Sequence, residues 1–197
     1  MNMLDVRCAR GSLWHRWHPH IHTPGTALNN QYRGPTAWND CLQVVEASDP
    51  PIGALGITDY CSIDQYEQVV EHRNEGRLGR VGLIFQNVEF RLSIETTKAS
   101  ALNLHLLFSP DGADHVEQIK RFLLGLEFIY AGGPYRCERL DLVRLGRACQ
   151  PDVSDETTAY AVGVNQFKVN LDQLEEAWTK NDWVNRNGRL TFSASFS

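Results

Sequence analysis

The chain has 197 residues, of which 42% are hydrophobic and 22% are charged, and its formal net charge is −5. These values are ordinary for a single globular domain with a sizeable core and do not favour disorder. The negative charge excludes binding to DNA or to a membrane surface through bulk charge alone. The start of the chain has no signal-peptide pattern, and no apolar run approaches the roughly 18 residues that span a bilayer. The five cysteines lack the Cys-x-x-Cys spacing of a zinc knuckle. We therefore expect one domain over residues 1–197, in a reducing cytoplasmic setting and without a membrane partner.

The first third of the chain predicts strands and helices in alternation. Residues 17–23 alternate in polarity as a short strand does, and a turn follows at Thr23-Pro24-Gly25. The apolar spacing of residues 36–48 predicts a helix, and residues 54–58 form an apolar run typical of a buried strand. Residues 62–76 begin at a serine and end at a glycine, which indicates a second helix.

The same kinds of pattern continue to the end of the chain. The expected elements are a strand over 80–94, a strand over 101–108, and helices over 112–129, 137–149 and 171–184, followed by an irregular tail over 190–197. An order of strand, helix, strand, helix implies crossover connections and a largely parallel sheet. Ligands bind such folds at the carboxyl ends of the strands, so polar residues at those ends are candidates for a functional site.

Potential metal ligands occur at or near the ends of four of these strands. His20 and His22 are two residues apart in the first strand and therefore point to one face. Asp59 and Glu89 each follow an apolar run, and His105 lies between leucines in the fourth strand. Histidine and carboxylate together suit zinc, manganese or iron. Ions held in this way would activate a water molecule and orient a phosphate for hydrolysis.

Each residue also has a structural interpretation. Asp59 could cap the helix that follows it, and Glu89 could pair with a nearby arginine. His105 could be a core histidine that is hydrogen-bonded to a backbone carbonyl. The combination of four strand ends, each with a ligand type, favours the metal site over these separate interpretations.

The same residues, in this order, resemble the motifs of the PHP family, named for polymerase and histidinol phosphatase domains. The motifs are "HPHIHT" at 18–23, "ITDY" at 57–60, Glu89 in "NVEF" and His105 in "NLHLLF". The details are most similar to the PHP module of TrlF-type bacterial proteins, in which an ATPase region follows the module. The stretches that carry this closer similarity are "HIHTP", "ITDYCSIDQY" and "GVNQFKVNLDQLEEAW".

The resemblance implies an α/β fold, a distorted (β/α)7 TIM-like PHP barrel that holds up to two or three Mn, Zn or Fe ions. It implies a metal-dependent phosphoesterase or nuclease that acts on phosphoesters or nucleic acid, in a group associated with defence against phage. His20 and His22 would bind one ion, Glu89 would bridge to a second, and His105 would complete the second site. Asp59 and Glu89 would be the catalytic carboxylates, with Asp59 as a ligand or as the residue that orients His22 or the attacking water.

Three departures from the family pattern bear on this expectation. His18 replaces an aspartate, and Tyr60 replaces a histidine that is a ligand in many members. The closing motifs of the family do not occur in this sequence, so the barrel is expected to be incomplete at its C-terminal end. The alternative function is therefore a catalytically impaired fragment or an interaction module with part of the metal site. An open sheet edge would favour a homo-oligomer or a missing C-terminal ATPase partner region.

Overall fold

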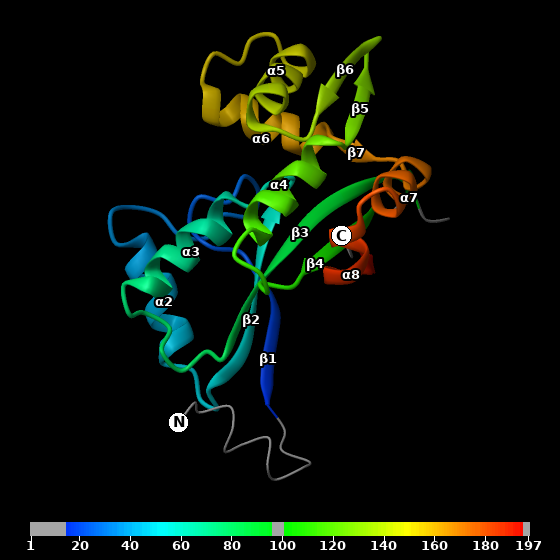
Figure 1. Cartoon of the computed structure of the whole chain (residues 1–197). Helices are drawn as coiled ribbons and strands as arrows, with labels where there is room; N and C mark the ends of the chain where they lie inside the picture. Colours follow the sequence, from blue (N-terminus) through cyan, green and yellow to red (C-terminus); the bar gives the residue numbers. More distant parts are fainter. Residues whose placement is uncertain (1–14, 96–100, 195–197) are drawn as a thin grey trace.

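The structure is a computed structural model of the chain, and it describes residues 15–95 and 101–194. The fold is mixed α/β, with one curled sheet that forms half of a barrel and helices packed around it (Figure 1). The strands are β1 (Arg16–Ile21), β2 (Ile52–Tyr60), β3 (Leu83–Glu95), β4 (Ala101–Phe108), β5 (Glu127–Tyr130), β6 (Gly133–Arg136), β7 (Lys168–Val169) and β8 (Gly188–Ala194). The helices are α2 (Ala37–Glu46), α3 (Asp64–Asn74), α4 (His115–Leu124), α5 (Arg139–Cys149), α6 (Glu156–Gln166), α7 (Leu171–Thr179) and α8 (Asp182–Asn187).

The main sheet has the strand order β1-β2-β3-β4-β8, and β7 pairs with the far end of β3. Strands β1, β2 and β3 are parallel and are connected through α2 and α3, as the sequence predicts. Strands β4 and β8 are antiparallel to their neighbours, so the prediction of a largely parallel sheet is wrong for this half. The connection from β3 to β4 is too short for a parallel crossover, which needs about a dozen residues or more, so β4 runs antiparallel to β3. Strand β8 then pairs antiparallel with β4 and so runs in the same direction as β3.

Two predicted helices are shorter than their sequence patterns suggest. Helix α4 ends at Leu124, where Gly125 follows, and the next residues form the hairpin of β5 and β6 instead of a further helical turn. The predicted helix over 171–184 is two helices, α7 and α8. Asn181 separates them, because its side chain accepts a hydrogen bond from the backbone N–H of Val184 and so caps a new helix.

The last described residues also differ from the prediction of an irregular tail over 190–197. Residues 190–194 belong to β8, which pairs with β4 along its length, while residues 195–197 lie outside the described residues. The unpaired edge of β4 provides the hydrogen-bonding groups that fix this segment as a strand. The sequence pattern also predicts no element over 156–166, where α6 packs closely on α5 at Gly146 and Gly163.

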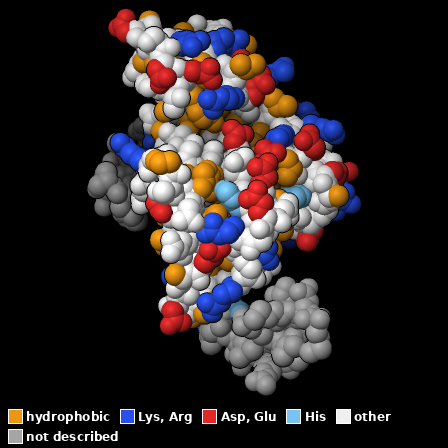
Figure 2. All heavy atoms as spheres, turned by 90° about the vertical axis from the view of Figure 1, so that its left-hand side faces the viewer, with side chains coloured by type: hydrophobic (Ala, Val, Ile, Leu, Met, Phe, Trp, Pro, Cys, Tyr) orange, Lys and Arg blue, Asp and Glu red, His pale blue; other side chains and the backbone are white. Residues whose placement is uncertain are grey.

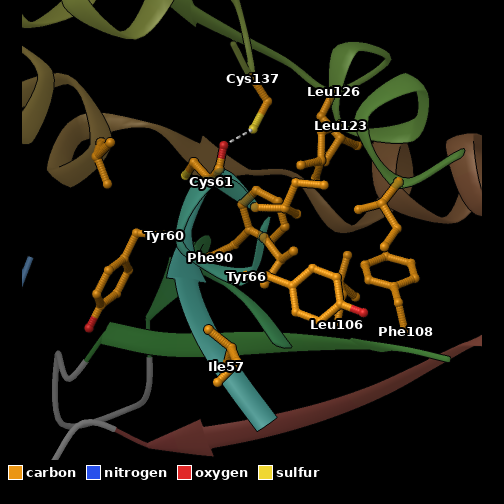
Figure 3. Close-up of a cluster of buried hydrophobic side chains, with 14 of the residues drawn as sticks. Ile57, Tyr60, Cys61, Tyr66, Phe90, Leu106, Phe108, Leu123, Leu126 and Cys137 are labelled. Atoms are coloured by element: carbon orange, nitrogen blue, oxygen red, sulfur yellow. Dashed lines mark hydrogen bonds between the residues drawn. The ribbon is translucent and has the colours of Figure 1, made fainter. Parts of the chain in front are cut away.

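The hydrophobic core joins one face of the sheet to the helices that cover it (Figure 3). Val88 and Phe90 of β3, with Leu104 and Leu106 of β4, are completely buried in this core. Because side chains alternate along a strand, the residues between them face the opposite side of the sheet. Glu89 is one of these residues, and the sheet therefore directs it away from the core side chains. Among the described residues, none of the helices combines the length and the hydrophobicity that crossing a bilayer requires.

Candidate metal centre

The strand register brings candidate ligands from different parts of the sequence into one row. Tyr60 of β2 is paired with Glu89 of β3, and Glu89 is paired with His105 of β4. Residues that are directly opposite in neighbouring strands present their side chains on the same face of the sheet. His20 and His22, at the end of β1, point to this face from the other side of β2. The sheet thereby gathers residues that are up to 85 positions apart in the chain.

His20, His22 and Glu89 form a group that could hold a metal ion, since one ligand atom from each lies within 4.8 Å of the others. The Nε2 atoms of His20 and His22 are 2.9 Å apart. Glu89 Oε2 lies 3.7 Å from His20 Nε2 and 3.9 Å from His22 Nε2. The Glu89 side chain is 3% exposed, whereas that of His20 is 43% exposed. The group is therefore anchored in the protein and open to solvent on the side of His20.

Neighbouring groups fix the orientation of the histidine rings. His22 Nδ1 lies 3.3 Å from the Thr58 carbonyl oxygen, to which it donates, so Nε2 carries the lone pair that faces the group. His105 Nδ1 donates in the same way to Asn87 Oδ1 at 3.1 Å. Asn87 is itself oriented, because its Nδ2 donates to the Pro19 carbonyl of β1 at 3.0 Å. Outer hydrogen bonds of this kind are typical of histidines that bind metals.

Burial keeps these histidines neutral. Burial lowers the pKa of His22 and of His105 to about 4, with further lowering by the neighbouring histidines. The pKa of His20 is also lowered, mainly by burial. A neutral imidazole has the free lone pair that a metal ligand needs, so the rings are in the binding form near neutral pH.

The Glu89 carboxylate provides the clearest indication that a cation fits this site. Its Oε1 atom accepts a hydrogen bond from Asn103 Nδ2 at 2.7 Å, while its buried Oε2 atom has no hydrogen-bond partner among the described residues. Burial raises the pKa of Glu89 to about 7. A buried carboxylate oxygen without a partner is costly. A cation between Glu89 and the two imidazoles would remove that cost, so the donor set fits a divalent ion.

His105 is next to this group without belonging to it. Its ring centroid lies 5.1 Å from that of His20, and its Nε2 atom is 2.9 Å from the Ser193 hydroxyl of β8. Both ring nitrogens of His105 are hydrogen-bonded, so an ion at its Nε2 atom would have to replace the contact with Ser193. His18, in contrast, is exposed on β1 and is not a member of the group.

Asp59 lies outside the group, although the sequence predicts it as a ligand and as a catalytic carboxylate. It is 1% exposed, and its Oδ2 atom accepts hydrogen bonds from the backbone N–H groups of Gln65 and Tyr66, each at 3.1 Å. Burial raises the pKa of Asp59 to about 8, against the opposing influence of these two N–H groups. Asp59 and Tyr60 are consecutive strand residues and point to opposite faces, so Tyr60 faces the metal group and Asp59 caps α3.

Several residues of the site are not identified by the motifs. Asn87 orients His105, Asn103 bonds Glu89, and Ser193 contacts His105. A signal for the two asparagines exists, because each stands two residues before a candidate ligand and so shares its strand face. No pattern in the sequence points to Ser193, since its place depends on the pairing of β8 with β4.

The sequence of this chain matches no family model and no curated protein. The resemblance to PHP motifs therefore rests on the motif residues alone.

Proposed function

We propose that the chain is a metal-dependent phosphoesterase of the PHP type, with nucleic acid as one class of substrate. The curled sheet would be part of a TIM-like PHP barrel. The observation that carries the proposal is the buried, unpartnered Glu89 Oε2 atom, which faces the Nε2 atoms of His20 and His22. These residues would hold a Mn, Zn or Fe ion, and His105 would take part in a second site.

A bound divalent ion supplies a Lewis acid and lowers the pKa of water for attack on a phosphoester. The chain contributes the position of the donors and the exclusion of solvent from Glu89, which is held by Asn103. The 43% exposure of His20 leaves an approach for substrate on the outer side of the group. The alternative nucleophiles Ser and Cys are not required by this chemistry.

The surface charge is consistent with a substrate that is recognised at the centre rather than by a basic surface. Figure 2 shows one face of the molecule, on which Lys and Arg side chains are interspersed with Asp and Glu side chains. No continuous basic patch is visible among the described residues of that face. The net charge of −5 gives no bulk attraction for a phosphoester, so the affinity would come mainly from the ions.

Elemental analysis of the purified protein tests the metal site directly. We expect one or more equivalents of manganese, zinc or iron, and a sharp fall in the double variant His20→Ala plus His22→Ala. His72→Ala is a matched control, because His72 lies on α3 beside Glu75 and away from the group. Absence of bound metal in the wild-type protein, even after reconstitution, would refute the proposal.

Activity measurements come second. We expect manganese-dependent hydrolysis of an aryl phosphate or of single-stranded DNA, and loss of that activity in Glu89→Ala. Activity that persists unchanged in Glu89→Ala would show that catalysis occurs elsewhere. If hydrolysis occurs, the similarity to TrlF-type proteins makes phage defence the first biological role to examine.

A second candidate function is an interaction module that binds an ion without catalysis. It is favoured by the position of Asp59 outside the metal group and by the edge strand β8, where Leu190 and Phe192 are 41% and 54% exposed. Exposed apolar side chains on an edge strand favour association with another chain. Stoichiometric metal without hydrolysis, together with a dimer in size-exclusion chromatography, would support this function over the first.

A further inference from the structure

Tyr60 brings its hydroxyl group into the space that the metal group surrounds. Its ring is stacked on that of His22, with centroids 5.1 Å apart and an interplanar angle of 8°. The Tyr60 hydroxyl oxygen lies 3.4 Å from His22 Nε2. In Figure 3, Tyr60 lies on the opposite side of β2 from Tyr66, which belongs to the core. Tyr60 is itself 6% exposed and belongs to the buried cluster, while its hydroxyl group lies on the side of His22.

A second residue determines where this hydroxyl oxygen lies. Asn29 Nδ2 donates a hydrogen bond to the Tyr60 hydroxyl oxygen at 2.6 Å. Asn29 comes from the loop between β1 and α2 and has a φ angle of 58°, in the left-handed region that asparagine tolerates better than most residues. The amide occupies one lone pair of the oxygen and leaves the other free. The oxygen is thus held from outside the group while its second lone pair remains available.

The separations between donor atoms are those of ligands around one ion. Metal bonds of about 2.0 to 2.2 Å to nitrogen and oxygen place the corners of a tetrahedron roughly 3.3 to 3.6 Å apart. The measured separations are 2.9 Å between the two histidine Nε2 atoms, 3.4 Å from Tyr60 to His22, and 3.7 and 3.9 Å from Glu89 to the histidines. These values scatter around the expected edge: His20, His22 and Glu89 match it pairwise, and the Tyr60 oxygen matches it with His22.

We propose that the Tyr60 hydroxyl oxygen, positioned by Asn29, is a fourth protein ligand of the ion held by His20, His22 and Glu89. The inference rests on the proposed metal site and specifies its ligand set. On coordination the phenolic proton passes to solvent, while the hydrogen bond from Asn29 to the oxygen is retained. An added anionic oxygen favours a hard ion, so the centre would accept iron(III) as well as zinc.

Iron(III) is the diagnostic probe, because a tyrosinate ligand gives it a visible charge-transfer band. We expect this band when the metal-free full chain is loaded with iron(III) from a nitrilotriacetate complex. The band should be absent in Tyr60→Phe, which keeps the ring and its stacking on His22. Tyr66→Phe is the matched control, because Tyr66 is a buried tyrosine whose hydroxyl contacts His115, and it should retain the band. Zinc affinity, measured by competition with a chelator, should fall roughly tenfold or more in Tyr60→Phe.

A second variant keeps the test decisive if Tyr60→Phe folds poorly. Asn29→Ala removes only the donor to the phenolic oxygen, so the band should persist but move to longer wavelength. A wild-type protein that binds zinc with the same affinity as Tyr60→Phe and shows no iron(III) band would overturn the inference and leave the proposed function standing. A wild-type protein that binds neither zinc nor iron would overturn both.

Discussion

Replacing Glu89 by glutamine should stabilise the metal-free protein and, at the same time, abolish its stabilisation by metal. Glu89→Gln retains a carbonyl oxygen that can accept the hydrogen bond from Asn103, and it removes the ionisable group. The side chain is 3% exposed, so the charge that is removed is one the fold keeps from water. Residues of a functional site commonly lower the stability of the fold that holds them.

The magnitude follows from the pKa of Glu89, which burial raises from 4.5 to about 7. The native state holds the proton more tightly than the unfolded chain does, so ionisation destabilises the fold as the pH rises from about 4.5 to about 7. At pH values near 8 the full cost, roughly 3 kcal/mol, is present, and near pH 5 less than about 1 kcal/mol of it remains. Glu89→Gln should therefore gain about that much stability near pH 8 and little near pH 5.

Urea unfolding in the presence of a chelator measures this difference at the two pH values. The exposed Glu175→Gln is the control, and its stability should follow that of the wild-type protein at both. Added zinc should then reverse the order of the two proteins. A ligand at one thousand times its dissociation constant stabilises the wild type by about 4.1 kcal/mol, which exceeds the cost of roughly 3 kcal/mol near pH 8, whereas Glu89→Gln should gain much less. Equal stabilities in chelator near pH 8 would show that Glu89 does not carry a costly buried charge, and equal gains from zinc would show that Glu89 does not bind the ion.

Two further predictions concern residues outside the metal group. Asp59→Asn should leave the zinc stoichiometry unchanged, because Asn can still accept N–H donors at the start of α3; a loss of zinc would instead support the ligand role that the sequence predicts. Gly146→Ala should destabilise the protein by about 3 kcal/mol or more in thermal unfolding, because its Cβ atom would lie 1.8 Å from the Ala159 carbonyl oxygen. Gly79→Ala is the control, since a Cβ atom there has no neighbour within 4 Å, and equal stability of the two variants would contradict the close packing of α5 on α6.

The first half of the fold could be predicted from the sequence because its signals are local. The apolar run of β2, the helical spacing of α2 and the serine and glycine that bound α3 each depend on neighbouring residues. The prediction that His20 and His22 point to one face also follows from the two-residue period of a strand. The helix over 156–166 was not predicted, because the close packing of Gly163 against Gly146 of α5 is not a local signal.

Part of the candidate site could also be predicted, because the type of a side chain is a local property of the sequence. The sequence indicates which residue types can bind a metal, and His20, His22 and Glu89 do lie together. It does not indicate that Asp59 faces α3 while its neighbour Tyr60 faces the group. Adjacent residues of a strand point to opposite faces of the sheet. The pairing register between β2 and β3 places Tyr60, and not Asp59, opposite Glu89.

The elements of the first half of the chain and the chemistry of the candidate ligands could be predicted from the sequence, because periodicity and side-chain type are local properties. Three features appear only in the folded chain: the direction of β4 and β8, the assembly of three candidate ligands from the end of β1 and from β3, and the contacts that Asn29 and Ser193 make at the site. Those features depend on strand pairing between distant segments. Such pairing is set by the burial of side chains and by the saturation of backbone hydrogen bonds over the whole sheet.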